Sequence, residues 1–130
     1  MLHREVIILT EREQNLIRST AKDFDIDVEI SDRRVFIFWS YWEYPNILNF
    51  EDEIRCKDLS EFIKGLGILS DNFNMHTESD MLFKYIHEDY PGIESEIAGD
   101  SVVDSCRQYM ITLDNFYDII EDKARYYKYI

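Results

Sequence analysis

IDVEISDRRVFIFWSYW, residues 26–42, carries the clearest β-structure signal in this chain. Residues 26–31 alternate apolar and polar side chains, which is the pattern of a strand with one buried face. Residues 34–42 are rich in β-branched and aromatic residues on both faces, which predicts a central strand with core on both sides. The two residues between them, Asp32 and Arg33, can turn the chain. We therefore expect an antiparallel hairpin.

Helical patterns lie on both sides of this hairpin. Upstream, Thr10 precedes Glu13 by three residues, which is the spacing of a capping box, and an apolar stripe behind it predicts a helix over roughly 11–24. Downstream, apolar residues at helical spacing after Asp58 predict a second helix, which two glycines weaken. A further helix is expected to start within 77–80 and to stop at Pro91.

The C-terminal part of the chain gives the clearest helix. Apolar residues recur at helical spacing from Leu113 to Tyr127, and basic residues gather near the end, as the helix dipole favours. Residues 106–112, CRQYMIT, are predicted to be extended, and residues 46–57 carry no clear pattern. The predicted fold is a single α+β domain over residues 1–130, in which three to four helices pack on a small, mostly antiparallel sheet.

Length and composition narrow the class of protein. The chain has 130 residues, 15% of them aromatic, and a net charge of −13. Such aromatic content argues against a disordered acidic tail, and the charge argues against direct binding to nucleic acid or to anionic membranes. We see no signal peptide or membrane-spanning stretch, so we expect a cytoplasmic protein in which Cys56 and Cys106 are reduced, buried thiols.

Catalytic and metal-binding motifs do not emerge from the sequence. The acidic run that starts at Asp23 resembles the opening of an EF-hand loop, but Val28 stands where glycine is needed and Arg34 where glutamate is needed. The run is better explained as the outer face of a strand. None of the three histidines has the spacing of a zinc site. We therefore expect no enzyme activity, no cofactor and no metal, although a small Asp/His or metal-dependent hydrolase stays an alternative.

The negative charge is concentrated in the second half of the chain. Residues 71–122 contain 13 acidic residues, and their only bases are Lys84 and Arg107, which gives this segment a net charge of −11. Solubility alone needs a smaller charge, of magnitude about 2–8 for a small domain. A surplus confined to one region favours a complementary, basic partner.

In size, charge and aromatic content, the whole chain resembles the immunity proteins that bacteria keep against their own nuclease toxins, including those of contact-dependent inhibition systems. No motif carries this resemblance, so no residue roles are transferred. It implies a protein that neutralises a basic nuclease toxin in a 1:1 complex. A phage-type nucleic-acid mimic that blocks a restriction or CRISPR effector has the same composition and stays an alternative.

Two groups of residues are the candidates for binding such a partner. Carboxylates in the acidic segment would speed association with the partner and form ion pairs with it. Aromatic side chains near the end of the strand predicted over 34–42 would anchor it. The predicted residues are Glu88, Asp89, Asp100, Asp104, Asp118, Glu121 and Asp122, with Trp42 and Tyr44 as anchors.

Overall fold

A computed structural model describes residues 9–43, 46–75 and 96–129 of the chain. Helix α1 (Glu11–Lys22) leads into three strands, β1 (Asp27–Ser31), β2 (Arg34–Glu43) and β3 (Asn46–Arg55). Helices α2 (Leu59–Met75) and α4 (Glu96–Tyr126) follow. Within the described residues the fold is thus α+β, with three helices and an antiparallel sheet, as the sequence predicted.

The start of α1 follows directly from its sequence. The Thr10 side chain accepts a hydrogen bond from the Glu13 backbone N–H at 3.1 Å, and the Thr10 N–H donates back to Glu13 Oε1 at 3.0 Å. This reciprocal pair is the predicted capping box. The other oxygen of Glu13 accepts from the Leu59 N–H at 2.7 Å, so one carboxylate stabilises the first turns of both α1 and α2.

The sheet is a meander with strand order β1-β2-β3 and both pairs antiparallel. A two-residue turn joins β1 to β2, and Asp32 in that turn has a φ of 51°, which aspartate tolerates better than most residues. The predicted hairpin is confirmed. The third strand was not predicted, because three acidic residues within 51–53 obscure its alternation of inward and outward side chains.

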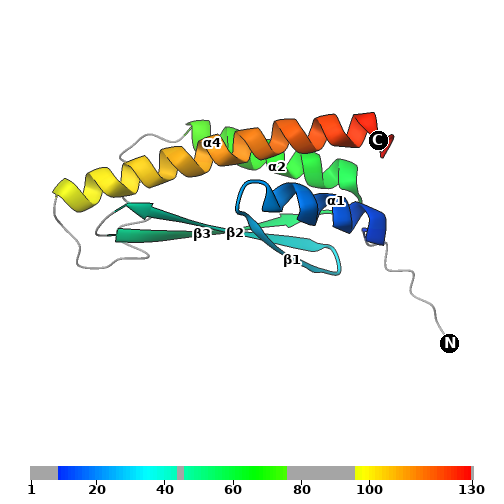
Figure 1. The fold of residues 1–130 in the computed structure, drawn as a ribbon, viewed down its shortest axis with the longest axis horizontal. Helices are drawn as coiled ribbons and strands as arrows, with labels where there is room; N and C mark the ends of the chain where they lie inside the picture. Colours follow the sequence, from blue (N-terminus) through cyan, green and yellow to red (C-terminus); the bar gives the residue numbers. More distant parts are fainter. Residues whose placement is uncertain (1–8, 44–45, 76–95, 130) are drawn as a thin grey trace.

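All three described helices lie on one face of the sheet, with α4 running the length of the molecule over α1, α2 and the strands (Figure 1). The buried core forms between these two layers. Its largest fully buried side chains include Phe50 from β3, Phe62 from α2 and three from α4, namely Tyr109, Leu113 and Phe116. The helix predicted at the C-terminus is therefore confirmed, and it docks on the core through the predicted stripe from Leu113 to Ala124. The last residue of that stripe, Tyr127, is instead 54% exposed and lies just past the end of α4.

Two sequence predictions are wrong. Residues 106–112 are helical, since α4 begins at Glu96 and its buried stripe continues upstream through Tyr109 and Cys106. The β-branched and aromatic composition of that segment hid its helical period. Strand β2 is central, but among the described residues only one of its faces carries core. Val35, Ile37 and Trp39 are buried under the helices, whereas no described helix lies over the opposite face. The helix predicted after residue 77 lies outside the described residues.

Candidate functional site

Three carboxylates meet where α2 packs against α4. Asp114 on α4 accepts a hydrogen bond from the hydroxyl of Ser70 on α2. Burial raises the pKa of Asp114, and repulsion from Asp118 and Asp71 raises it further. Because like charges raise one another's pKa only at short range, this seam holds concentrated negative charge, and no described basic residue forms an ion pair with it.

Tyr117 and Glu121 extend the acidic seam toward the C-terminus of α4. A hydrogen bond to the Glu121 carboxylate raises the pKa of Tyr117, and burial and the charges of Glu121 and Asp118 raise it further. Arg125 lies 2.9 Å from Glu121 in an exposed i,i+4 ion pair and opposes this shift. Arg125 thus partly neutralises Glu121, whereas Asp118 is exposed and has no ion pair with a described residue.

The outer surface of α4 combines carboxylates with exposed apolar side chains. Asp118 and Asp122 are exposed. Ile111 and Ile119 are 46% and 39% exposed, and Tyr126 is 79% exposed. The spacing of these five residues places them along the solvent side of one helix. We call them the α4 ridge. Protein–protein interfaces combine an apolar core with a polar rim, and the α4 ridge offers both kinds of side chain.

The structure brings together only some of the predicted partner-binding residues. Asp118, Glu121 and Asp122 lie within two turns of one another on α4. Asp100 and Asp104 lie on the same helix, further toward its N-terminus, and Trp42 lies on β2 near the far end of the sheet. Glu88, Asp89 and Tyr44 lie outside the described residues.

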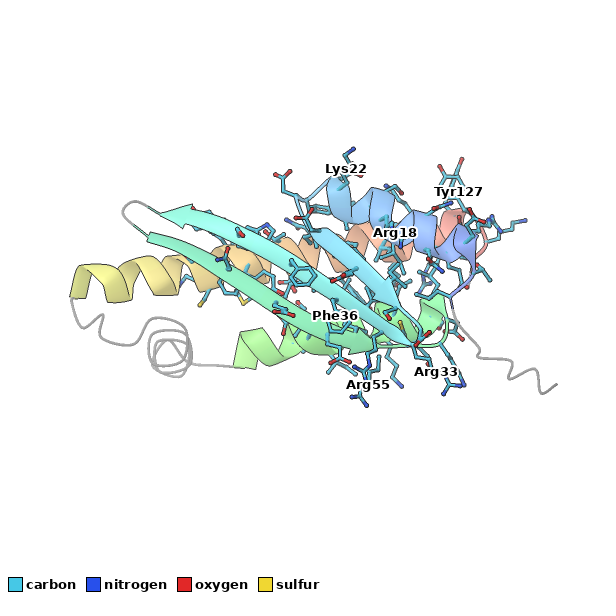
Figure 2. The ribbon with its side chains drawn as sticks, turned by 90° about the horizontal axis from the view of Figure 1, so that it is seen from below. Arg18, Lys22, Arg33, Phe36, Arg55 and Tyr127 are labelled. Carbon is cyan, nitrogen blue, oxygen red and sulfur yellow. The ribbon has the colours of Figure 1, made fainter. Side chains whose placement is uncertain are left out.

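The face of the sheet away from the helices is a second charged surface. The exposed carboxylates of β1 confirm the outer strand face that the sequence predicted, whereas the carboxylates of β3 were not predicted. In Figure 2 the strands stand in front of the helices, and Phe36 lies on the face toward the viewer. Asp27, Phe38 and Glu51 pair across the strands in one row, and Glu29, Phe36 and Glu53 form the next row. These rows could be predicted only by pairing β2 with residues 46–55, and the sequence did not predict a strand in that segment.

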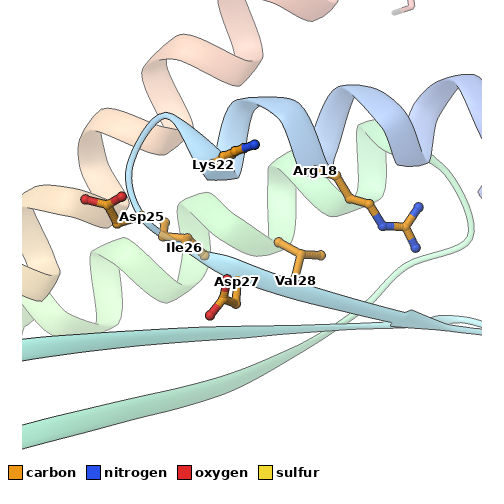
Figure 3. A pocket seen from close by; sticks show the side chains of 6 residues that line it. All are labelled: Arg18, Lys22, Asp25, Ile26, Asp27 and Val28. Atoms are coloured by element: carbon orange, nitrogen blue, oxygen red, sulfur yellow. The ribbon is translucent and has the colours of Figure 1, made fainter.

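A shallow groove lies between the C-terminal half of α1 and the start of β1 (Figure 3). Its volume is about 560 Å³. Arg18 and Lys22 line it from α1, while Asp25 and Asp27 line it from the other side. With two cations and two carboxylates around it, the groove has no preference for one sign of charge.

The described part of the chain offers neither a metal site nor a reactive thiol. No group of three or more His, Cys, Asp or Glu residues there could hold a metal ion, and all three histidines lie outside it. Cys56 and Cys106 are buried and are not joined in a disulfide, as predicted. Burial raises the pKa of Cys56 to about 12, with nearby acids such as Glu61 adding to the shift, so this thiol stays protonated at neutral pH.

No protein-family model, curated protein or solved structure matches the chain. Among the described residues, none of the helices has the length and apolar character that a bilayer crossing requires.

Proposed function

We propose that this chain is a non-enzymatic binding protein that neutralises a basic protein partner in a 1:1 complex. The partner we propose is a bacterial nuclease toxin, so that the chain acts as an immunity protein in the cytoplasm and needs no cofactor. The observation that carries the proposal is the α2–α4 seam. There the exposed carboxylates of Asp118, on the α4 ridge, and Asp71, on α2, repel the partly buried carboxylate of Asp114.

Unrelieved repulsion between carboxylates costs folding stability, and a basic partner would remove that cost on binding. A nuclease supplies such a partner, because the groove that holds its nucleic acid is lined with basic side chains. Screened pairs of exposed charges contribute only about 0–1 kcal/mol each. The affinity would therefore depend on desolvated pairs, and the exposed Ile111 and Ile119 would help to exclude water around them.

The test is association with the toxin encoded beside this protein's gene, expressed as a catalytically inactive variant. A stable 1:1 complex is expected on size exclusion with light scattering. Its association rate should fall steeply with added salt, since steering acts over a Debye length of about 10 Å at 0.1 M.

A matched pair of variants assigns the charge effect to a surface. Asp118→Asn with Asp122→Asn removes two exposed charges from the α4 ridge, whereas Asp25→Asn with Asp32→Asn removes two exposed charges from the turns before and after β1, outside the ridge. Both control positions have positive φ, which asparagine adopts readily. We expect the ridge variant to associate more slowly than the control at low salt, and at the same rate at high salt. An association rate that does not change with salt concentration, or an equal decrease of that rate in both variants, would contradict the proposal.

A nucleic-acid mimic is the second candidate, and the open sheet face favours it. Asp27 and Glu29 on β1, and Glu51 and Glu53 on β3, form two lines of carboxylates. Neighbours within a line are about 7 Å apart, near the spacing of phosphates along a strand. Breadth separates the two functions: a mimic inhibits several unrelated DNA-binding proteins, whereas an immunity protein inhibits one toxin.

A further inference from the structure

The open face of the sheet repeats one arrangement in two neighbouring rows. In each row a phenylalanine of β2 stands between a carboxylate of β1 and a carboxylate of β3. The register gives Asp27, Phe38 and Glu51 in one row and Glu29, Phe36 and Glu53 in the next. Both rings are half-buried although no described helix covers this face. Two aromatic surfaces are therefore left open to a ligand, with negative charge on either side.

The two rows differ in whether their carboxylates form ion pairs with described residues. Glu53 lies 3.3 Å from Arg34 and 3.4 Å from Arg55, so it is already paired. Asp27, Glu29 and Glu51 have no ion pair with any described residue. The unpaired charge is thus concentrated around Phe38 and on the β1 side of Phe36.

The two Phe-containing rows are bounded at one end by arginines and at the other by a pair of neutral polar side chains. Toward the β1–β2 turn, the next row holds Ser31, Arg34 and Arg55, whose positive charge closes that end to a cation. Toward the other end, the Ser40 hydroxyl donates to Asn49 Oδ1 at 2.6 Å, which gives a neutral polar boundary. Between these limits the two rows offer space for two adjacent cationic side chains, because rows lie about 7 Å apart.

We propose that this open face is a docking surface for arginine side chains of the basic protein partner, with guanidinium planes stacked on Phe36 and Phe38 and paired with Asp27, Glu29 and Glu51. The proposal rests on the proposed function, and it adds to the α4 ridge a second surface for arginine recognition, on the face of the sheet away from α4. Arginine fits better than lysine, since its planar guanidinium stacks on an aromatic ring and still donates to a carboxylate at its edge. A second copy of this chain fits poorly, because each copy carries a net charge of −13.

The experiment titrates the isotopically labelled full chain with a synthetic peptide, acetyl-Gly-Arg-Gly-Arg-Gly-Arg-Gly-amide, and follows backbone amide shifts by NMR. Alternate residues of an extended peptide are about 7 Å apart, which matches the rows. Saturable shifts are expected in the segments 27–29, 36–38 and 51–53. The lysine peptide of the same length should bind more weakly, by about two- to fivefold for each ring engaged.

Variants separate ring stacking from charge. Phe36→Leu with Phe38→Leu keeps the net charge and an apolar face, and should abolish the preference for arginine over lysine. Glu51→Gln should weaken both peptides, and it tests the site even if the leucine variant fails to fold. Asp118→Asn with Asp122→Asn on the α4 ridge is the control, and it should leave the shifts on the sheet unchanged.

Shifts that map to the α2–α4 seam, or equal binding of both peptides in every variant, would overturn the docking surface. These outcomes do not decide the proposed function, which is judged by the toxin complex. If the complex forms and is insensitive to Phe36→Leu with Phe38→Leu and to Glu51→Gln, the docking surface is refuted and the function stands. If the arginine peptide binds as expected but no basic toxin does, the function fails and the surface remains.

Discussion

Two glycines of α2 allow a matched test of how closely this helix packs. A Cβ added at Gly65 would lie 2.5 Å from Ile54 Cγ2 on β3, and one added at Gly67 would lie 2.8 Å from Tyr117 Cε2 on α4. Ordinary contacts between carbon atoms are about 3.5–4.0 Å, so each neighbour would have to retreat by about 1 Å. Alanine in place of glycine inside a helix should otherwise stabilise by about 1 kcal/mol.

The two neighbours differ in their freedom to move. Ile54 is only 5% exposed and lies between the sheet and α2, whereas Tyr117 is half-buried and its ring can swing toward solvent. Overpacking a core typically costs about 1–3 kcal/mol. We therefore expect Gly65→Ala to lower the free energy of unfolding by up to about 2 kcal/mol, because the overpacking cost of about 1–3 kcal/mol outweighs a gain in helix propensity of about 1 kcal/mol. Gly67→Ala should change it by less than about 0.5 kcal/mol, because the propensity gain offsets a smaller rearrangement.

Urea denaturation followed by circular dichroism at 222 nm measures both variants on the same protein. Since the propensity gain is common to the two, their difference reports the close approach of α2 to the sheet. If Gly65→Ala were more stable than the parent chain by the full helix-propensity gain, the packing of α2 on Ile54 would be looser than the structure has it.

Three further substitutions test the core and the seam. Ile120→Ala should cost about 2–5 kcal/mol in urea denaturation, since Ile120 is fully buried; a loss below about 1 kcal/mol would contradict the docking of α4. Thr20→Val should stabilise by about 1 kcal/mol, because the buried Thr20 hydroxyl has no hydrogen-bond partner in the described residues; a loss of stability would reveal one. Asp118→Asn should raise the melting temperature at pH 7 by relieving Asp114, whose pKa is raised in the fold. That gain should vanish on acidification to about pH 3, where carboxyls are protonated, and a gain that persists there would refute the repulsion.

Local signals in the sequence predicted the parts of the fold that depend on local chemistry. The Thr10 and Glu13 capping box, the β1–β2 hairpin and the stripe from Leu113 to Ala124 all depend on residues close together in the chain, and all three are present. The N-terminal extension of α4 was missed, because the residues around Tyr109 favour strands by propensity while their burial follows a helical period. Long-range packing overrode the local preference there.

The glycines of α2 show why contacts between distant residues resisted prediction. On propensity alone, Gly65 and Gly67 argue against a helix. In the structure each one faces a side chain at its closest approach, Ile54 from β3 and Tyr117 from α4. A glycine that weakens a helix locally thus permits close packing globally, and only the positions of the other elements reveal which effect prevails.

The two candidate surfaces likewise differ in whether their residues are close together in the sequence. Counting charge along the chain located the acidic segment that includes Asp118 and Asp122, because residues four apart lie on one face of a helix. It could not locate the rows of the open face, where Asp27 and Glu51 stand in one row only because β2 pairs with both neighbouring strands. The first 64 residues carry a smaller net charge than the rest, yet their sheet gathers carboxylates on one side and arginines at one end. Net charge along a sequence therefore measures how strongly a partner is attracted, whereas strand register determines which of its side chains can be recognised.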